Sequence, residues 1–372
     1  MLVGTPKEIK SNEYRVGLVP ASVRELVHHG HKVVVETGAG AGIGVADSDY
    51  RAAGARIVTT AAEVFRRAEL VVKVKEPQPV ECAMLRPGQV LFTYLHLAAD
   101  AAQAKALLKS GATCIAYETV TDARGGLPLL APMSEVAGRM AIQVGAHYLE
   151  KAQGGAGVLL GGVPGVPAAN VVILGGGVAG TNAARMAMGL EAKVTVIDKS
   201  LPRLYELDLQ FGPILNTIFS TVDAIESYVA TADLVVGAVL VPGAAAPRLV
   251  SRALVKRMRE GSVMVDISID QGGCFETSRP TTHADPVYTV DGVIHYCVTN
   301  MPGGVARTST FALNNATLPF TMALADQGVA QALAENPHLR AGLNIHAGKT
   351  THRAVAEALR LKFTPPEQAL RA

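Results

Sequence analysis

Three titratable residues each stand at the end of a short apolar run. Lys75 closes the run ELVVKVK, His96 follows QVLFTYL, and Asp270 follows SVMVDISI. In open α/β sheets, ligands bind beyond the carboxyl ends of the strands. A lysine or histidine at the mouth of a buried strand is held rigidly and partly desolvated, which moves its pKa toward working pH. The three residues therefore predict a site that exchanges protons with a small substrate.

Arg15 lies in the early loop NEYRVGLVP, ahead of a helix expected to begin near Pro20. Its planar guanidinium suits the recognition of a carboxylate. Each of the four residues also has a purely structural interpretation: Lys75 as a lysine snorkelling from a strand end, His96 as a core histidine bonded to a backbone carbonyl, Asp270 as a helix N-cap or turn acid, and Arg15 as a surface arginine paired with Glu13. Taken one at a time, these residues do not decide a function.

A metal site is not expected. His28, His29 and His31 crowd around Gly30, but the sequence ELVHHGHKVVVE is typical of a helix that ends at a C-cap glycine before a strand. The chain has no HExxH motif and no paired CxxC, so hydrolytic or structural zinc is not predicted.

A glycine loop with the spacing G-x-G-x-x-G occupies residues 175–180. It follows the strand-like run NVVIL and opens the helical pattern TNAARMAMGLEA. Gly175 permits the tight turn, Gly177 lets backbone approach a pyrophosphate, and Gly180 lets the helix pack close to the strand. The N–H groups at the start of the helix then face the phosphates. The loop predicts a bound dinucleotide.

Asp198 ends the next run, KVTVID, 18 residues after Gly180. An acid at this place accepts hydrogen bonds from the adenosine ribose and repels a 2′-phosphate, which favours NAD over NADP. Arg203 lies close by and weakens this preference, since an arginine there can accommodate a 2′-phosphate.

The apolar runs alternate with helical patterns along the whole chain. They cover residues 32–36, 69–75, 89–95, 112–117, 170–174, 193–198, 233–241 and 262–269. Runs of this length without polar alternation are buried on both faces, as parallel strands are. The fold class expected is α/β, with two doubly wound Rossmann-like domains.

One domain is predicted to be inserted into the other. A glycine- and proline-rich tract (124–132) precedes a helical pattern at 134–151, and a second boundary fits near 300–307, after which helical sequence returns with a break at Asn336-Pro337. The predicted limits are 1–128 with 306–372 for a substrate and catalytic domain, and 129–305 for an NAD-binding domain.

Composition excludes several classes of protein. The 372 residues are 49% hydrophobic and carry a net charge of +2, which argues against disorder and gives no reason to expect nucleic acid or a membrane surface as partner. Residues 154–184 hold no charge, but glycines, prolines and Asn170 divide them into pieces too short to span a membrane. The N-terminus lacks the features of a signal peptide, and four dispersed cysteines are typical of reduced thiols, so a cytoplasmic protein is expected.

These segments together resemble the L-alanine dehydrogenases. The similarity extends over nearly the whole chain and rests on GTPKEIKSNEYRVGLVP, VKVKEP, TYLHLA, MSEVAGRMAIQVGAHYLEK, GGGVAG, DISIDQGGC and TNMPGGVARTSTFALNNATLP. The resemblance implies an NAD-dependent enzyme that interconverts L-alanine and pyruvate with ammonium, built as a homo-oligomer, usually a hexamer.

The resemblance also implies individual roles. Arg15 and Lys75 would bind the substrate, His96 would be the catalytic acid and base, and Asp270 its partner. The implied cofactor-binding positions are Ser134, Gly175, Gly177, Val178, Ala179, Gly180, Asp198, Arg203, Ser220, Val239, Leu240, Ile267, Asp270, Val298, Asn300 and Met301. Which of Lys75, His96 and Asp270 first takes a proton is left open by the sequence.

Two other functions are compatible with parts of the pattern. One is a saccharopine-type amino-acid dehydrogenase, which would need a larger substrate pocket. The other is the NAD-binding part of a proton-translocating transhydrogenase, which would dock on a membrane partner. The complete set of Arg15, Lys75, His96 and Asp270 favours self-contained catalysis.

Overall fold

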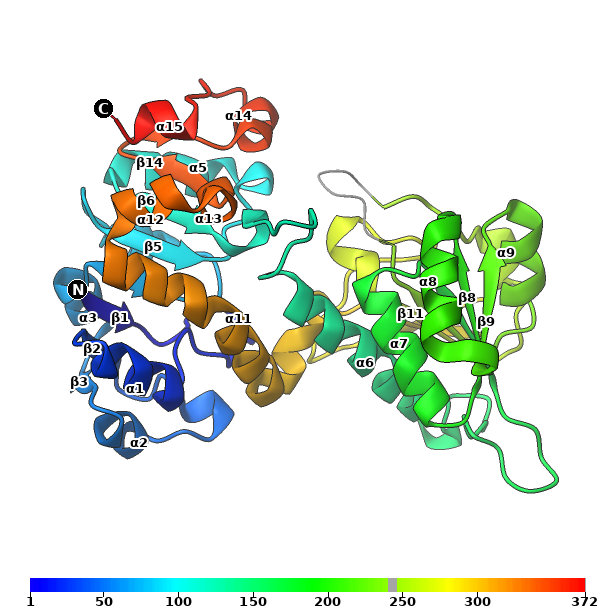
Figure 1. The fold of residues 1–372 in the computed structure, drawn as a ribbon. Helices are drawn as coiled ribbons and strands as arrows, with labels where there is room; N and C mark the ends of the chain where they lie inside the picture. The colour runs from blue at the N-terminus through cyan, green and yellow to red at the C-terminus, as the bar shows by residue number, and fades with distance from the viewer. Residues whose placement is uncertain (240–245, 372) are drawn as a thin grey trace. The chain divides into compact units, whose positions relative to one another are not determined.

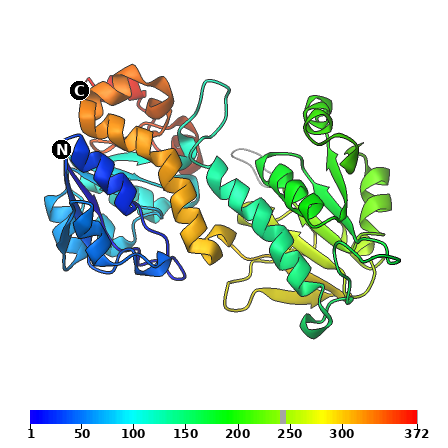
Figure 2. The same cartoon turned by 60° about the horizontal axis from the view of Figure 1, so that its bottom comes forward.

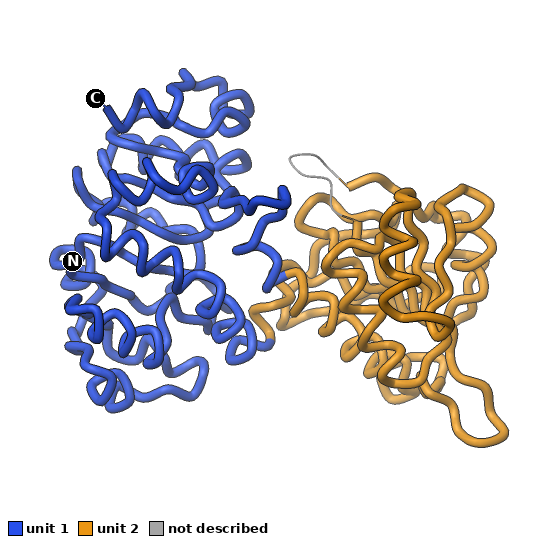
Figure 3. The backbone as a smooth tube through the Cα atoms, in the orientation of Figure 1, with its two compact units in different colours: residues 1–133, 305–372 blue, residues 134–304 orange. Residues whose placement is uncertain are grey.

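The protein folds into two compact units. The structure, a computed structural model, describes residues 1–239 and 246–371. Unit 1 comprises residues 1–133 and 305–372, and unit 2 comprises residues 134–304, so the second is inserted into the first (Figure 3).

Unit 1 is built on an eight-stranded sheet with the order β15-β14-β6-β5-β4-β1-β2-β3. Its strands are β1 (Leu2–Thr5), β2 (Lys32–Glu36), β3 (Arg56–Val58), β4 (Leu70–Val72), β5 (Val90–Thr93), β6 (Thr113–Ala116), β14 (Leu343–His346) and β15 (Lys349–Thr350). The first six pair in parallel, whereas β14 runs antiparallel to β6 and to β15. The carboxyl ends of β4 and β5, which precede Lys75 and His96, are therefore neighbours.

Helices cover both faces of this sheet. One face packs against α1 (Pro20–His28), α11 (Ala306–Gln327), α12 (Val329–Glu335) and α13 (Pro337–Ala341). The other packs against α3 (Ala61–Arg67), α4 (Pro79–Cys82), α5 (Ala101–Ser110) and α14 (Arg353–Leu359). Helix α11 lies beside α1 in both views of the fold, so the returning chain completes the layer begun at the N-terminus (Figures 1 and 2).

Unit 2 is a second doubly wound sheet with the order β12-β13-β11-β10-β7-β8-β9. Its strands are β7 (Asn170–Leu174), β8 (Lys193–Asp198), β9 (Leu215–Phe219), β10 (Leu234–Gly237), β11 (Val263–Asp266), β12 (Val287–Val290) and β13 (Val293–Tyr296). Only β12 is antiparallel, to β13. Helices α9 (Val222–Val229) and α10 (Arg252–Val255) pack on one face, and α6 (Ala131–Tyr148) and α7 (Val178–Gly189) on the other.

The predicted α/β fold class is confirmed, with two differences in detail. All eight apolar runs contain strands, but the strands are shorter, because the chain leaves the sheet before the last residues of several runs. Seven strands were not predicted, namely β1, β3, β9, β12, β13, β14 and β15, and three of them form the antiparallel edges. The helix expected over 134–151 runs from Ala131 to Tyr148.

The uncharged stretch 154–184 is a loop followed by the buried strand β7 and the start of α7, as predicted. Within the described residues, no helix has the length and apolar character needed to cross a membrane. Helix α1 ends at His28, and Gly30 has a φ of 83°, the left-handed conformation expected of a glycine that ends a helix.

Candidate active site and dinucleotide-binding site

Arg15 is buried rather than on the surface. Its side chain is only 1% exposed and forms a two-point ion pair with Glu13, with Nε 2.7 Å from Oε1 and Nη2 2.6 Å from Oε2. Its third nitrogen, Nη1, lies 3.0 Å from the Met133 sulfur. The expected pairing with Glu13 is therefore correct, but a surface location is wrong. A buried, oriented guanidinium keeps its charge because Glu13 balances it.

Lys75 stands three residues beyond the end of β4 and is half-buried. Its backbone is held in place, because the Thr93 hydroxyl donates to its carbonyl at 2.9 Å. Burial, followed by the nearby positive charge of Arg15, lowers the pKa of the Lys75 ammonium from its usual value. No hydrogen-bond partner for its Nζ exists among the described residues, which suits an amine that awaits a substrate oxygen.

His96 stands three residues beyond β5 on an exposed left-handed turn, with φ 51° and ψ 37°. A non-glycine residue in this region is uncommon and needs support from its surroundings. The support comes from Glu118, whose Oε1 accepts the His96 N–H at 2.6 Å and the Leu95 N–H at 3.3 Å. The imidazole stacks on the Tyr94 ring, with centroids 5.8 Å apart and planes 6° apart. The alternative of a core histidine is thus wrong.

Tyr94 packs against His96 and lies within electrostatic range of Arg15. Its ring is buried under His96, and its hydroxyl donates to the Leu129 carbonyl at 2.5 Å. Burial raises the pKa of Tyr94, and the positive charge of Arg15 acts in the opposite direction. Since Arg15 also acts on Lys75, the structure gathers a guanidinium, an ammonium and an imidazole at one end of the sheet. This combination can hold a carboxylate and move a proton.

In the glycine loop of unit 2, a different structural reason explains each of the three glycines. Gly175 has a φ of 97°, which the tight turn requires. A Cβ on Gly180 would lie 1.8 Å from the Gly175 carbonyl oxygen, so only glycine lets α7 approach the strand this closely. A Cβ on Gly177 would meet no atom within 4 Å, so this glycine is required by nothing in the chain itself. No side chain caps α7 at Gly177. Exposed first-turn N–H groups and open space fit a pyrophosphate.

Asp198 both ends β8 and holds the glycine loop. Its Oδ2 accepts the Gly176 N–H at 2.6 Å and its Oδ1 accepts the Ser200 N–H at 2.8 Å. A carboxylate has about four acceptor sites, so it retains capacity for ribose hydroxyls. Arg203 points into the loop instead, with Nε donating to the Gly176 carbonyl at 2.7 Å and Nη2 to Thr181 Oγ1 at 2.7 Å. An arginine already engaged in this way is a weak candidate for a 2′-phosphate.

Asp270 is exposed on a short 3₁₀ turn, Ile267–Gln271, that follows β11. The N-cap of this turn is Asp266, not Asp270, since the Asp266 Oδ1 accepts the Ser268 N–H at 3.0 Å. Asp266 is fully buried and also accepts the Cys274 N–H at 2.9 Å and the Ser278 hydroxyl. Burial raises the pKa of Asp266. The sequence thus assigned a possible capping role to the wrong aspartate, and Asp270 is left facing solvent.

The remaining cofactor positions share one edge of the unit 2 sheet, the edge formed by the carboxyl ends of the parallel strands. Gly175 follows β7, Asp198 ends β8, Ser220 follows β9, Val239 follows β10, Ile267 and Asp270 follow β11, and Val298, Asn300 and Met301 follow β13. Val178 and Ala179 form the first turn of α7, and Ser134 lies in the first turn of α6. Leu240 lies outside the described residues.

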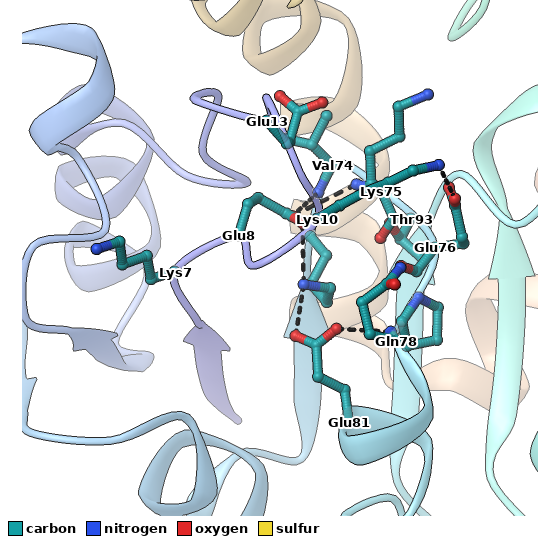
Figure 4. Close-up of polar contacts among 12 residues, drawn as sticks. Lys7, Glu8, Lys10, Glu13, Val74, Lys75, Glu76, Gln78, Glu81 and Thr93 are labelled. Atoms are coloured by element: carbon teal, nitrogen blue, oxygen red, sulfur yellow. Dashed lines mark hydrogen bonds and ion pairs between the residues drawn. The ribbon is translucent and has the colours of Figure 1, made fainter. Parts of the chain in front are cut away.

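Sequence reasoning missed a buried charged cluster beneath Lys75. Lys73, Glu8 and Glu81 are almost completely buried, with Lys73 Nζ 3.1 Å from Glu8 Oε2 and 2.7 Å from Glu81 Oε1. Figure 4 shows Glu8 and Glu81 near Lys75. One signal was available, because a lysine inside the apolar run ELVVKVK needs a buried counter-charge. The partners were not identifiable, since Glu8 is 65 residues away and looks like any polar residue of a loop.

A doubly wound unit with this glycine loop and this strand-end aspartate defines a dinucleotide-binding α/β protein. Two family models match the chain: "Alanine dehydrogenase/PNT, N-terminal domain" over residues 4–137 and "Alanine dehydrogenase/PNT, C-terminal domain" over residues 141–353. The chain belongs to the alanine dehydrogenase/PNT family.

Individual relatives agree over the full length. The chain is 63% identical over 363 residues to the alanine dehydrogenase of Halomonas elongata, covering 98% of both chains, and 55% identical to that of Mycolicibacterium smegmatis, covering both completely. A solved L-alanine dehydrogenase superposes with a TM-score of 0.94 at 53% identity, over 97% of this chain and 99% of that one. A transhydrogenase from Sinorhizobium meliloti superposes with a TM-score of 0.81 at 27% identity, over 95% and 100%.

Proposed function

We propose that this chain is an NAD-dependent enzyme that converts L-alanine to pyruvate and ammonium and also catalyses the reverse reductive amination. The observation that carries the proposal is the full-length identity of 63% to an alanine dehydrogenase, with the Arg15, Lys75, His96 and Asp270 set complete. The transhydrogenase alternative is weaker, because the identity to a protein of that title is 27%. No observation favours a saccharopine-type activity.

Bound NAD supplies the acceptor for the hydride removed from the alanine Cα, and the residues at the strand ends of unit 2 would hold it. Gly177 and the N–H groups of Val178 and Ala179 would receive the pyrophosphate, and Asp198 would receive the adenosine ribose. Ser134, Ser220, Val239, Leu240, Ile267, Val298, Asn300 and Met301 are proposed as further contacts, and Arg203 as a support of the loop.

The chain's own residues divide the remaining work. Arg15 would bind the substrate carboxylate, because a planar, permanently charged guanidinium suits the recognition of a carboxylate. Lys75 would hydrogen-bond the keto oxygen or carboxylate and stabilise negative charge that develops there. Burial and the charge of Arg15 lower the pKa of Lys75, so its surroundings disfavour the ammonium, and a bound anion would offset part of this effect.

His96 would move the protons. Oxidation of the amino acid leaves an imine, to which water adds before ammonia leaves, and both steps need a group that takes and gives protons near neutral pH. The proposal is supported by the exposure of the imidazole and by its stacking on Tyr94, which restrains the ring. Asp270 would orient the amino group or the imidazole.

A direct assay tests the proposal. Purified protein is mixed with NADH, pyruvate and ammonium, and the loss of NADH absorbance is followed. Turnover with pyruvate is expected. Absence of turnover with pyruvate, or turnover only with a large keto acid and lysine as amine donor, would contradict it.

We further propose a cytoplasmic homo-oligomer, with a hexamer as the expected form. The four cysteines, Cys82, Cys114, Cys274 and Cys297, are all buried and free, which fits a reducing compartment. The mass of the native protein in solution, measured by light scattering, tests the oligomeric state, and a monomeric mass would contradict it.

A further inference from the structure

The main chain at Lys75 is held from two sides. The Thr93 hydroxyl of β5 donates to the Lys75 carbonyl at 2.9 Å, and Glu8 Oε1 accepts the Val74 N–H at 2.7 Å, with the Lys75 N–H at a longer 3.4 Å (Figure 4). Glu8 comes from the loop after β1, and Thr93 from the end of β5. The strand β4, which leads to Lys75, lies between those two strands in the sheet.

Glu8 is itself held by a chain of opposite charges. Its second oxygen, Oε2, accepts a hydrogen bond from Lys73 Nζ at 3.1 Å, and Lys73 also donates to Glu81 Oε1 at 2.7 Å. Glu81 is anchored in turn, because its Oε2 accepts the Gln78 N–H at 2.8 Å at the start of α4. Lys73 is 0% exposed, and such a buried ammonium is retained only with good partners.

The free-energy cost of burying these charges indicates a role in positioning rather than in stability. Buried ion pairs are often no more stabilising than apolar residues of the same volume, since desolvation of the charges offsets their attraction. Burial raises the pKa of Glu8 although Lys73 acts against this, so the carboxylate gains little from its site. What the cluster does provide is geometry: it ties the loop after β1, which is distant in the sequence, and the start of α4, which is close, to the backbone next to Lys75.

We propose that Glu8, supported by Lys73 and Glu81, is a positioning residue that together with Thr93 sets the main chain of Lys75 and so aims its ammonium at the substrate. Glu8 acts through Lys75 and touches no reacting atom. The inference rests on the proposed function, in which Lys75 binds the keto acid. It adds Glu8 and Thr93 to the residues that determine affinity for that substrate.

A double-mutant cycle tests the proposal. The variants Glu8→Gln, Lys75→Gln and the double variant are compared with the wild type in kcat and KM for pyruvate, at saturating NADH and ammonium. Glu8→Gln alone is expected to raise KM for pyruvate about tenfold, whereas in the Lys75→Gln background it adds less than about twofold, because the residue through which it acts is gone. Equal factors in both backgrounds would overturn the proposal.

Matched controls separate positioning from a loss of folded protein. The KM for NADH should stay within about twofold in all variants, since the cofactor residues belong to unit 2. Asp47→Asn is the control substitution: Asp47 also accepts a backbone N–H after a strand of unit 1, from Gly38 at 2.8 Å, but contacts neither Lys75 nor Glu8. It should leave KM for pyruvate unchanged.

Thr93→Val provides a second route if Glu8→Gln does not fold. Valine has nearly the shape of threonine and favours a strand, but cannot donate to the Lys75 carbonyl. The same non-additivity with Lys75→Gln is expected, and independent, multiplicative effects would again contradict the proposal.

A readout without turnover distinguishes this inference from the proposed function. Amide hydrogen exchange in residues 73–76 should be faster in Glu8→Gln than in the wild type, with the Asp47→Asn variant unchanged. Absence of turnover in the wild type would contradict the proposed function alone. Unchanged exchange in Glu8→Gln would overturn the anchoring role whatever the activity.

Discussion

The Lys75 loop of unit 1 and the glycine loop of unit 2 share one kind of backbone contact but leave different groups available. In both, a carboxylate accepts a backbone N–H of the loop: Glu8 from Val74, and Asp198 from Gly176. Beyond that contact they differ. The protein satisfies the Lys75 main chain on both sides and leaves the side chain available, whereas around Gly177 it removes the side chains and leaves backbone available.

The contrast fits the ligand proposed for each loop. A reacting side chain must be held within a fraction of an ångström, which requires that its backbone be immobilised. A pyrophosphate is recognised by several N–H groups at once, so the backbone itself must stay unoccupied and accessible. The His96 loop follows the first pattern, with Glu118 in the place of Glu8.

The largest effect on turnover is expected from His96→Ala, which removes the imidazole from the His96 loop. Loss of a positioned acid and base lowers kcat by about 10²–10⁴-fold. NADH affinity, measured by fluorescence titration, should stay within a few-fold, because the glycine loop lies in unit 2. An equal loss of turnover and of NADH binding would show that His96 is structural.

Two glycine substitutions should separate binding from folding in unit 2. Gly177→Ala places a methyl group where a Cβ meets no protein atom, so the thermal midpoint should not change while the Kd for NADH rises about tenfold or more. Gly180→Ala places the same group 1.8 Å from a carbonyl oxygen, so stability should fall by about 1–3 kcal/mol or more. The reverse pattern would contradict the roles assigned to the two glycines.

Asp198→Gly should relax the preference for NADH over NADPH by about tenfold, because a charge that repels a 2′-phosphate is removed. The change also removes the acceptor for the Gly176 N–H, so the affinity for both cofactors should fall. The ratio of kcat/KM for the two cofactors is the measurement. An unchanged ratio would show that the carboxylate does not touch the ribose.

The smallest effect concerns pH. The pKa of Lys75 is lowered by burial and by Arg15, with Lys10 also lowering it and Glu76 and Glu13 raising it. Its positive charge is complete below this pKa and is lost as pH rises through it. Binding of pyruvate to the enzyme–NADH complex without ammonium should therefore weaken at a pH below the ordinary lysine value of about 10.4. Lys75→Gln should remove this alkaline transition, and its persistence would assign the transition to another group.

Local features were the predictable ones. The strand runs, the end of α1 near Gly30 and the turn at residues 175–180 depend on neighbours within a few residues, so periodicity and glycine spacing identify them. The short edge strands β3, β12 and β15 carry weaker patterns, since they are partly exposed and owe their pairing to the sheet.

By itself the sequence determined the α/β alternation, the glycine loop with Asp198, and the placement of the titratable residues Lys75, His96 and Asp270 just after three strands. Only the tertiary structure decided that Arg15 and Glu13 are buried, that Glu118 supports the left-handed turn at His96, and that Glu8 and Lys73 meet beneath Lys75. For Glu118 and Glu8 the physical reason is sequence separation. A buried charge must find a partner wherever the fold brings one, and no local pattern records which distant residue that is.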